Sequence, residues 1–370
     1  MIPVFEPIIG EEEIEFVTDA LRKGELSGTF GHYLEGFEKE FSSYTGCKYG
    51  VAVSSGTTAL HLAVAAAGIG AGDEVLVSSS TNIATALGVV HNGAIPVPVD
   101  CEEETWNLDI NLIESLITSK TKAIIPVHLF GHPVDMEALM KIADKHNLVV
   151  IEDCAESHGA SCRGKMTGSF GDMGCFSFYA NKVITTGEGG MVVTNNEELY
   201  TKLKLLRNLA FTDPRFLHEE AGYNFRMTGY QAAMGLAQTR KIDQIINEKR
   251  RVAHAYNKFL FGIRGLQLPV ERDWAKNVYW MYAVVVNTEF GISRDELARR
   301  LKMEGVDTRT FFCSMSDQPC LQKIEGFKKI PTPVASRIWE SGLYLPSTHT
   351  LSDADIFFVA EAIKKIQKAI

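Results

Sequence analysis

Between about residues 50 and 195, short runs of apolar, β-branched residues alternate with stretches of helical periodicity. Nearly every position within these runs is apolar, as expected for strands whose sheet is covered by helices on both faces. Strands that alternate with helices in this way predict a doubly wound, mostly parallel α/β sheet. The predicted strands are 50–55, 74–80, 95–100, 123–131, 148–153, 175–179 and 190–194, and the clearest helices between them are 57–68, 84–93 and 135–146.

The remainder of the chain predicts a second, smaller unit. A helical pattern from Thr228 to about Phe261 contains no proline, and no glycine after Gly235, so we expect one long helix that leaves the first unit. A strand, a helix and a closing amphipathic helix follow at 279–287, 294–305 and 353–369. We therefore expect a large α/β domain over residues 1–250, including an N-terminal loop segment, and a small α+β domain over residues 251–370.

Composition narrows the possible partners. The formal net charge of −9 argues against a broad nucleic-acid-binding face, because phosphate binding needs clustered Lys and Arg. No run approaches the ~18–20 apolar residues of a membrane span, and the first residues lack the basic start and apolar core of a secretory signal. The seven cysteines form no CxxC pair, which favours reduced thiols over disulfides or zinc. We expect a cytoplasmic protein that binds neither nucleic acid nor membrane.

Candidate chemistry is sought directly after the predicted strands, because ligands of open α/β sheets bind at the carboxyl ends of strands. The first strand ends in the small residues 54–60, SSGTTAL, which include Gly56 and Thr57 and open a helix. Free N–H groups at a helix start, the helix dipole and two hydroxyls together form an anion cradle that suits one phosphate monoester. The lysine of a nucleotide-binding GxxxxGK[ST] loop is missing. A simple helix N-cap would use the same residues.

Asp153 closes an apolar strand, where a carboxylate is costly to bury without a partner. A protonated ring nitrogen would be such a partner, and a helix-capping role is the alternative. The neighbouring Glu152 and Glu156 could suggest a metal, but adjacent strand residues point to opposite faces of the sheet. We therefore expect no metal site.

Lys182 follows the strand 175–179 and precedes a turn rich in glycine and hydroxyl groups. A lysine enclosed in a site loses proton affinity and becomes an amine that can form a Schiff base. Most lysines are solvated surface residues, so the combination matters more than Lys182 alone. A phosphate cradle, a buried acid at a strand end and a lysine are the three contacts that pyridoxal phosphate (PLP) requires.

The motifs around these residues resemble the DegT-type (StrS-like) sugar aminotransferases, which are PLP enzymes of the aspartate aminotransferase fold. The resemblance covers nearly the whole chain, and within the family it is greatest to the perosamine synthases. It implies the fold type I architecture of PLP enzymes, with a large doubly wound domain and a smaller C-terminal domain. The motifs that carry it are SGTFGHYLEGFEKEF, SGTTALHLA, GDEVLV, PVHLFGHPVDM, VIEDCAESHGA, FSFYANKVITTGEGGM, GYNFRMTGYQAAMGLAQ, GVDTRTFF and YLPSTHTLSDADI.

The resemblance implies a role for each matching residue. Lys182 would hold PLP covalently, and Asp153 would pair with its pyridine nitrogen. Glu156 would contact the side of the ring that carries the phenolic oxygen, where many relatives have Gln. Asn224 would reach the phosphate from a neighbouring subunit, so the active site would need a homodimer. The phosphate would be bound within the chain by Gly56, Thr57 and Ser177.

Some positions depart from the family pattern or suggest substrate contacts. Asn82 stands where relatives usually place an aromatic residue that stacks on the cofactor, and Asn cannot stack in that way. Arg309 is not followed by the Pro and His that relatives often carry, and this stretch helps to form the sugar pocket. The residues that we expect to contact the substrate are Ser27, His128, Arg309 and His349.

The resemblance implies transamination from L-glutamate to a nucleotide-linked 4-keto-6-deoxy sugar, such as conversion of GDP-4-keto-6-deoxymannose to GDP-perosamine. A ketone at C3 stays open, because residue types alone do not fix how a pocket orients the sugar. A PLP-dependent sugar dehydratase is disfavoured because such relatives replace the lysine with His. A scaffold protein would be expected to lose one of the three cofactor contacts. An aminotransferase or lyase acting on amino acids alone is disfavoured, because the 27–41 loop and the segment 223–228, YNFRMT, resemble those of enzymes acting on sugars.

Overall fold

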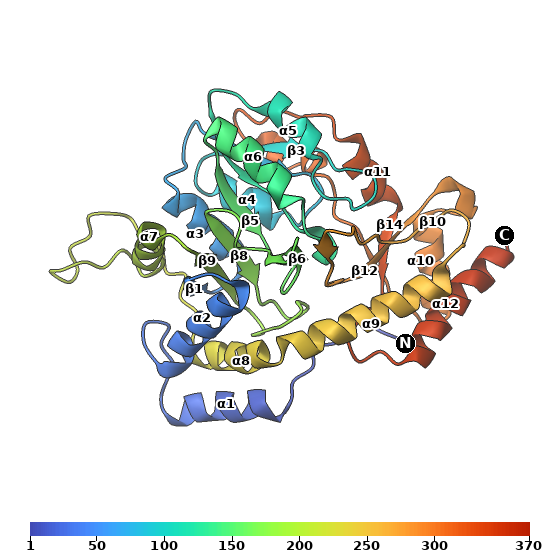
Figure 1. The fold of residues 1–370 in the computed structure, drawn as a ribbon, viewed down its shortest axis with the longest axis horizontal. Coiled ribbons are helices and arrows are strands. Elements are labelled where there is room, and N and C mark those ends of the chain that lie inside the picture. Colours follow the sequence, from blue (N-terminus) through green and yellow to red (C-terminus); the bar gives the residue numbers. More distant parts are fainter.

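The computed structural model describes residues 1–370 and contains two main sheets with their helices (Figure 1). The helices are α1 (Glu11–Arg22), α2 (His32–Thr45), α3 (Gly56–Ala66), α4 (Ala84–Val90), α5 (Ile110–Leu116), α6 (Met136–His146), α7 (Glu197–Arg207), α8 (Gly229–Arg240), α9 (Ile242–Leu260), α10 (Arg294–Met303), α11 (Pro333–Ser341) and α12 (Asp353–Lys368). Short 3₁₀ turns are η1 (Leu129–Gly131), η2 (Thr288–Phe290), η3 (Met315–Asp317) and η4 (Leu321–Lys323).

The larger sheet has seven strands in the order β1-β9-β8-β5-β4-β2-β3. They are β1 (Tyr49–Val53), β2 (Glu74–Ser78), β3 (Ile95–Val99), β4 (Thr121–Ile125), β5 (Val149–Asp153), β8 (Met173–Ser177) and β9 (Gly190–Thr194). Only β9 runs antiparallel to its neighbours, β1 and β8, and the other pairs are parallel. This confirms the prediction of a doubly wound, mostly parallel sheet.

Helices cover both faces of this sheet, which explains the nearly continuous apolar strands. Successive residues of β1 show the division, because Val51 and Val53 belong to one core cluster and Ala52 to another. The first cluster packs against α3 and α7. The second includes Phe37 and Phe41 of α2, which lies across the other face together with α8.

The smaller sheet has four antiparallel strands in the order β10-β12-β14-β13. They are β10 (Leu266–Gln267), β12 (Tyr282–Val286), β13 (Arg309–Thr310) and β14 (Gly342–Leu345). Its core is shared with α9, α10 and α12. A third, minor sheet joins β11 (Ala275–Lys276), β6 (Ser161–Cys162) and β7 (Lys165–Met166). The predicted boundary at residues 250–251 falls within α9, and the division into domains 1–250 and 251–370 stays a prediction.

Three predicted elements are wrong in part. The strand predicted over 123–131 ends at Ile125, and Phe130 adopts a left-handed conformation with φ 52°. The strand predicted over 279–287 begins only at Tyr282, because Tyr279 also has a positive φ of 49°. The helix predicted over 228–261 breaks at Lys241, which has φ −113° and ψ 11° and pairs with the buried Glu13.

The fold gathers strand ends at one edge of the large sheet. Because β1 and β8 are both antiparallel to β9, they run in the same direction, and both Val53 and Ser177 are paired with Gly190. Asp153, at the end of β5, is paired with Cys175 of β8. The residues that follow these strands therefore lie close together. None of the helices combines the length and the apolar character that crossing a membrane requires.

Candidate active site

A cavity of about 290 Å³ lies at this edge of the large sheet. Its walls come from the ends of β5 and β8, from the segments that follow β1, β2, β4, β5 and β8, and from the C-terminal part of the chain, which supplies Trp280, Phe312 and Tyr344. Seven of the residues predicted from the sequence line it: Gly56, Thr57, Asn82, Asp153, Glu156, Ser177 and Lys182. The fold therefore places at one cavity residues that lie up to about 130 positions apart in the sequence, as expected for residues at the carboxyl ends of strands.

The start of α3 forms the cradle that was expected for a phosphate. Ser55 caps the helix, and its hydroxyl accepts from the N–H of Thr58 at 3.1 Å. A Cβ on Gly56 would lie 2.7 Å from the Cβ of Ser177, so only glycine lets the helix start approach this serine. The first N–H groups of the helix and the Ser177 hydroxyl thus face one cavity, which suits a small anion.

Asp153 is a buried carboxylate without a cation in ion-pair contact. One oxygen accepts from the Thr85 hydroxyl at 2.8 Å, and the other accepts from the N–H of Ala155 at 3.1 Å. Burial raises the pKa of Asp153, although Thr85, Ala155 and the charge of Lys182 oppose the shift. A protonated ring nitrogen in the cavity would supply the missing positive charge.

Lys182 is half-buried, and its amine lies against the indole of Trp280, with Nζ 4.0 Å from the ring centroid. Burial lowers the pKa of Lys182, while the carboxylates of Glu156 and Asp153 act in the opposite direction. A lowered pKa increases the fraction of neutral amine, which is the form that attacks a carbonyl carbon.

Glu156 is buried on the cavity wall and accepts from the N–H of Phe130 at 2.8 Å. Burial raises its pKa to about 7, against the charge of Lys182 and the Phe130 N–H. Phe130 directs this N–H from its left-handed conformation, which costs a non-glycine residue about 1–3 kcal/mol. Strain of this kind is concentrated at functional sites, and here it orients a carboxyl group on the cavity wall.

These residues fit PLP. The cradle at Gly56 accommodates a phosphate, the unpaired carboxylate of Asp153 matches a protonated pyridine nitrogen, and the Lys182 amine is set for a covalent bond. Asn82 lines the cavity, but its carboxamide oxygen accepts from the N–H of Ala84, and an amide offers no aromatic face. Aromatic rings on the cavity wall come instead from Tyr179, Trp280, Phe312 and Tyr344.

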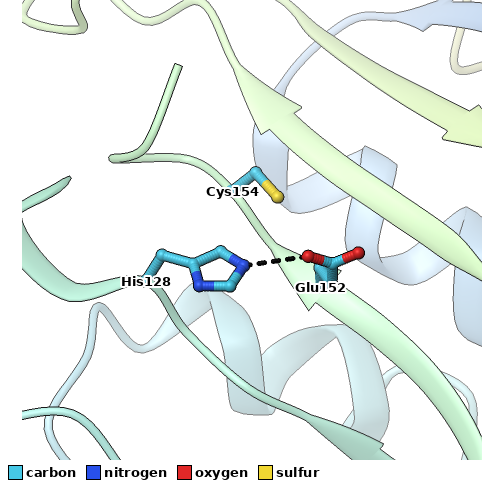
Figure 2. Close-up of side chains that lie close together, drawn as sticks. All are labelled: His128, Glu152 and Cys154. Carbon is cyan, nitrogen blue, oxygen red and sulfur yellow. Dashed lines mark hydrogen bonds and ion pairs between the residues drawn. The ribbon is translucent and has the colours of Figure 1, made fainter. Parts of the chain in front are cut away.

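His128 lies outside the cavity lining, in a buried cluster with Glu152 and Cys154 (Figure 2). Its Nδ1 accepts from the N–H of Val134 at 3.1 Å, so the ring proton is on Nε2, which donates to Glu152 at 3.1 Å. Backbone N–H groups of the 168–171 turn also donate to Glu152. Burial raises the pKa of Cys154 well above its usual value, which keeps the thiol protonated. The cluster is a structural tie that joins β5 to this turn.

Four other predicted residues lie outside the lining of this cavity. Ser27 is bonded to Thr29 within its own loop, and Arg309 is exposed beside Asp307. His349 is half-buried, and burial lowers its pKa to about 4. Asn224 is exposed and forms a backbone bridge with Asn208. Their roles, including that of Asn224 across a subunit interface, stay predictions.

Thr85 and Trp280 are among the residues that shape the site and that the sequence did not predict. Thr85 lies in the predicted helix 84–93, where a hydroxyl three positions after Asn82 gave no sign that it would bond Asp153. Trp280 lies in the apolar run 279–287, whose pattern predicts a strand and gives no sign of a contact with Lys182. Only the fold places its indole beside Lys182.

Comparison with known proteins places these observations in a family context. The model of the DegT/DnrJ/EryC1/StrS aminotransferase family matches residues 7–364. GDP-perosamine synthase of Escherichia coli O157:H7 is 40% identical over 365 residues, covering 98% of each chain. A dTDP-3-amino-3,4,6-trideoxy-alpha-D-glucose transaminase of Streptomyces venezuelae is 40% identical over 84% of this chain and 82% of its own. The crystal structure of S. venezuelae DesV aligns with a TM-score of 0.91 at 36% identity, covering 97% and 95% of the two chains.

Proposed function

The chain belongs to the DegT/DnrJ/EryC1/StrS aminotransferase family, and from this premise we propose that it converts GDP-4-keto-6-deoxymannose to GDP-perosamine with L-glutamate as the amino donor. It is a sugar transaminase that uses PLP as its cofactor. The observation that carries the chemistry is the convergence of Lys182, Asp153 and the Gly56 cradle on one cavity. The substrate is proposed because GDP-perosamine synthases match at 36–40% identity over 98% or more of this chain.

PLP, when bound, supplies the electron sink and the carrier of the amino group between donor and acceptor. In the resting enzyme, Lys182 Nζ would hold it covalently. When it is not bonded to the cofactor, the Lys182 amine would be the base within the cavity that takes the proton from the α-carbon of the donor. The lowered pKa of Lys182 favours this role, because an amine must be in its neutral form before it can accept a proton.

The two carboxyl groups have different proposed tasks. Asp153, whose carboxylate is held in place by Thr85 and Ala155, would keep a proton on the pyridine nitrogen, and that positive charge would in turn favour the ionised form of Asp153. Glu156 is oriented by the Phe130 N–H on another part of the wall. Two nearby acids commonly take different roles in one site because their different environments give them different pKa values.

A homodimer is part of the proposal. Asn224 is exposed and lies outside the cavity of its own chain, so any contact with the phosphate would be made in a partner subunit. We also propose the cytoplasm as the location, because five of the seven cysteines are buried as free thiols.

The test follows the amino group with candidate acceptors. The purified protein is first converted by L-glutamate to its amino form, which is then titrated with GDP-, dTDP- and UDP-linked keto sugars while the visible absorption band is monitored. Recovery of the band with GDP-4-keto-6-deoxymannose alone is expected. Recovery with a 3-keto sugar linked to dTDP would favour the second candidate, which the similarity to the S. venezuelae transaminase supports. If none of the sugar nucleotides restores the band, both proposed substrates are contradicted.

A further inference from the structure

Trp280 is held at its indole end against the loop that carries the catalytic lysine. The side chain is only 3% exposed, and its Nε1–H donates to the carbonyl oxygen of Asn181 at 2.7 Å. The face of the same ring lies 4.0 Å from Lys182 Nζ. One indole therefore fixes the backbone next to Lys182 and forms a wall beside its amine.

The backbone of Trp280 is held by a second lysine. Lys249 of α9 is 2% exposed, and its Nζ donates to the carbonyl oxygen of Trp280 at 2.6 Å and to that of Ser347. No carboxylate lies within ion-pair distance of Lys249, and burial lowers its pKa to about 7. A buried amine without a counter-ion is expensive, and an apolar residue of the same length would often serve stability equally well. We therefore infer that Lys249 contributes mainly by holding the backbone, through its two hydrogen bonds to the carbonyl oxygens of Trp280 and Ser347.

The chain on either side of Trp280 is also fixed. Tyr279 has a positive φ of 49°, which is strained for a residue with a large side chain. Gly131 packs so closely that a Cβ there would lie 2.9 Å from the nitrogen of Tyr279 and 3.0 Å from that of Trp280. The backbone thus has little freedom to move the indole away from Lys182.

We propose that Trp280 is a positioning residue for Lys182, and that Lys249 sets the place of Trp280 through its carbonyl oxygen. The inference rests on the proposed function in one respect, that Lys182 carries the cofactor. The indole restricts the directions open to the Lys182 side chain. Its π face also stabilises positive charge on the lysine nitrogen, because the quadrupole of the ring attracts cations.

Other groups face Lys182 and act on the same charge. Asp153 at the end of β5 and Glu156 just after it favour a positive charge on Lys182. His158 lies nearby, and burial lowers its pKa to about 3, so it is neutral. Trp280 is the cation-stabilising group that comes from the C-terminal part of the chain, and it can be changed without altering these three.

The test compares Trp280→Leu, Trp280→Phe and the matched control Trp106→Leu as PLP-loaded enzymes. Trp106 is equally buried, at 2%, and packs in the same aromatic group against Phe311 at 5.3 Å and Phe130 at 6.3 Å. The measured quantity is the pH midpoint at which the visible band of the lysine-bound cofactor changes between its protonated and unprotonated forms. Thermal unfolding reports the loss of packing in each variant.

Trp280→Leu is expected to lower this midpoint by about half to one and a half pH units, the range that corresponds to the loss of one partly desolvated cation–π contact. It should also reduce kcat by more than it changes KM. Trp280→Phe keeps an aromatic face but loses the bond to Asn181, so its midpoint should lie between those of Trp280→Leu and the wild type. Trp106→Leu should keep the wild-type midpoint even where its unfolding temperature falls.

Lys249→Met tests the second part of the proposal, and its midpoint should move in the same direction as that of Trp280→Leu. If Lys249→Met does not fold, Lys249→Gln takes its place, because an amide still donates to one of the two carbonyl groups. Unchanged midpoints in both Trp280 variants would overturn the proposal and leave the proposed function standing. A wild-type protein without any lysine-bound band would overturn the proposed function as well.

Discussion

Lys182 lies between influences that change its proton affinity in opposite directions. Burial lowers its pKa, whereas Glu156 and Asp153 favour the charged amine. Neither effect is visible in the residue itself, and both depend on what the strand ends bring together. At this scale the site is a set of ordinary side chains whose properties are changed by their neighbours.

Gly56 is the residue whose replacement tests the phosphate cradle most simply. In Gly56→Ala the new Cβ meets Ser177 at 2.7 Å, so either the helix start or the serine must shift. Overpacking of this kind typically costs about 1–3 kcal/mol, and a distortion of that size in the cradle should raise the Kd for PLP by roughly 5- to 150-fold. An absorbance titration of the cofactor-free protein measures it. The control is Gly70→Ala, whose Cβ meets its nearest atom at 3.6 Å, and an equal loss in both variants would contradict the cradle.

The raised pKa of Glu156 predicts that the stability of the cofactor-free protein depends on pH. Its pKa is raised from 4.5 to about 7, so the folded state binds this proton more tightly than the unfolded state. The resulting stabilisation is complete below about pH 4.5 and is lost as the pH rises to about 7. Relative to Glu156→Gln, the wild type should lose about 3 kcal/mol of unfolding free energy across this range. Denaturant unfolding at several pH values measures the difference, and a constant difference would show that Glu156 is not protonated by burial.

At the scale of elements, strand ends were more predictable than the segments between them. The residues after β1, β5 and β8 were found from sequence because parallel strands expose their carboxyl ends at one edge. The left-handed conformations of Phe130 and Tyr279 could not be predicted, because nothing in an apolar run signals a positive φ. The break at Lys241 likewise depends on its pairing with Glu13, which lies far away in the sequence.

The crossing of α2 and α8 contains two glycines that differ in the room around them. A Cβ on Gly235 would lie 2.6 Å from the ring of Phe37, which is completely buried, whereas one on Gly36 meets a flexible Leu236 methyl at 3.2 Å. Gly235→Ala should therefore lower the free energy of unfolding by about 1–3 kcal/mol. Gly36→Ala should be near neutral, because Ala has the better helix propensity. Thermal unfolding of both variants measures this, and a stabilised Gly235→Ala would contradict the packing at this crossing.

At the scale of the whole molecule, the cavity joins the large sheet to the C-terminal part of the chain. Trp280, Phe312 and Tyr344 close walls whose other residues follow the strands of the large sheet. Residues this distant in sequence cannot be assigned to one cavity from spacing, which is why Trp280 and Tyr344 were not predicted. Phe312 belongs to the stretch after Arg309, which the family resemblance implied as part of the sugar pocket. Asn224 does not line this cavity in its own chain, and in the proposed dimer it would contact the cavity of the partner subunit.

Subunit complementation tests that dimer. Lys182→Ala should remove turnover, and Asn224→Asp should weaken phosphate binding by placing an anion beside it. A hybrid dimer of the two variants would contain one site with an intact Lys182 and an intact Asn224 from the partner. Random re-association of equal amounts should therefore restore up to about a quarter of the wild-type activity, since half the dimers are hybrid and each has one intact site. If hybrid dimers are shown to be present in the mixture and activity is still not restored, Lys182 and Asn224 act within one chain.

The most direct test of the central claim is the visible absorption spectrum of the purified protein before and after L-glutamate is added, with Lys182→Ala as the control. The wild type is expected to show the yellow band of lysine-bound PLP, which glutamate bleaches as the amino group is transferred. The control should lack this band. A wild-type protein that stays colourless and does not take up PLP would contradict the assignment of Lys182, Asp153 and the Gly56 cradle as a cofactor site.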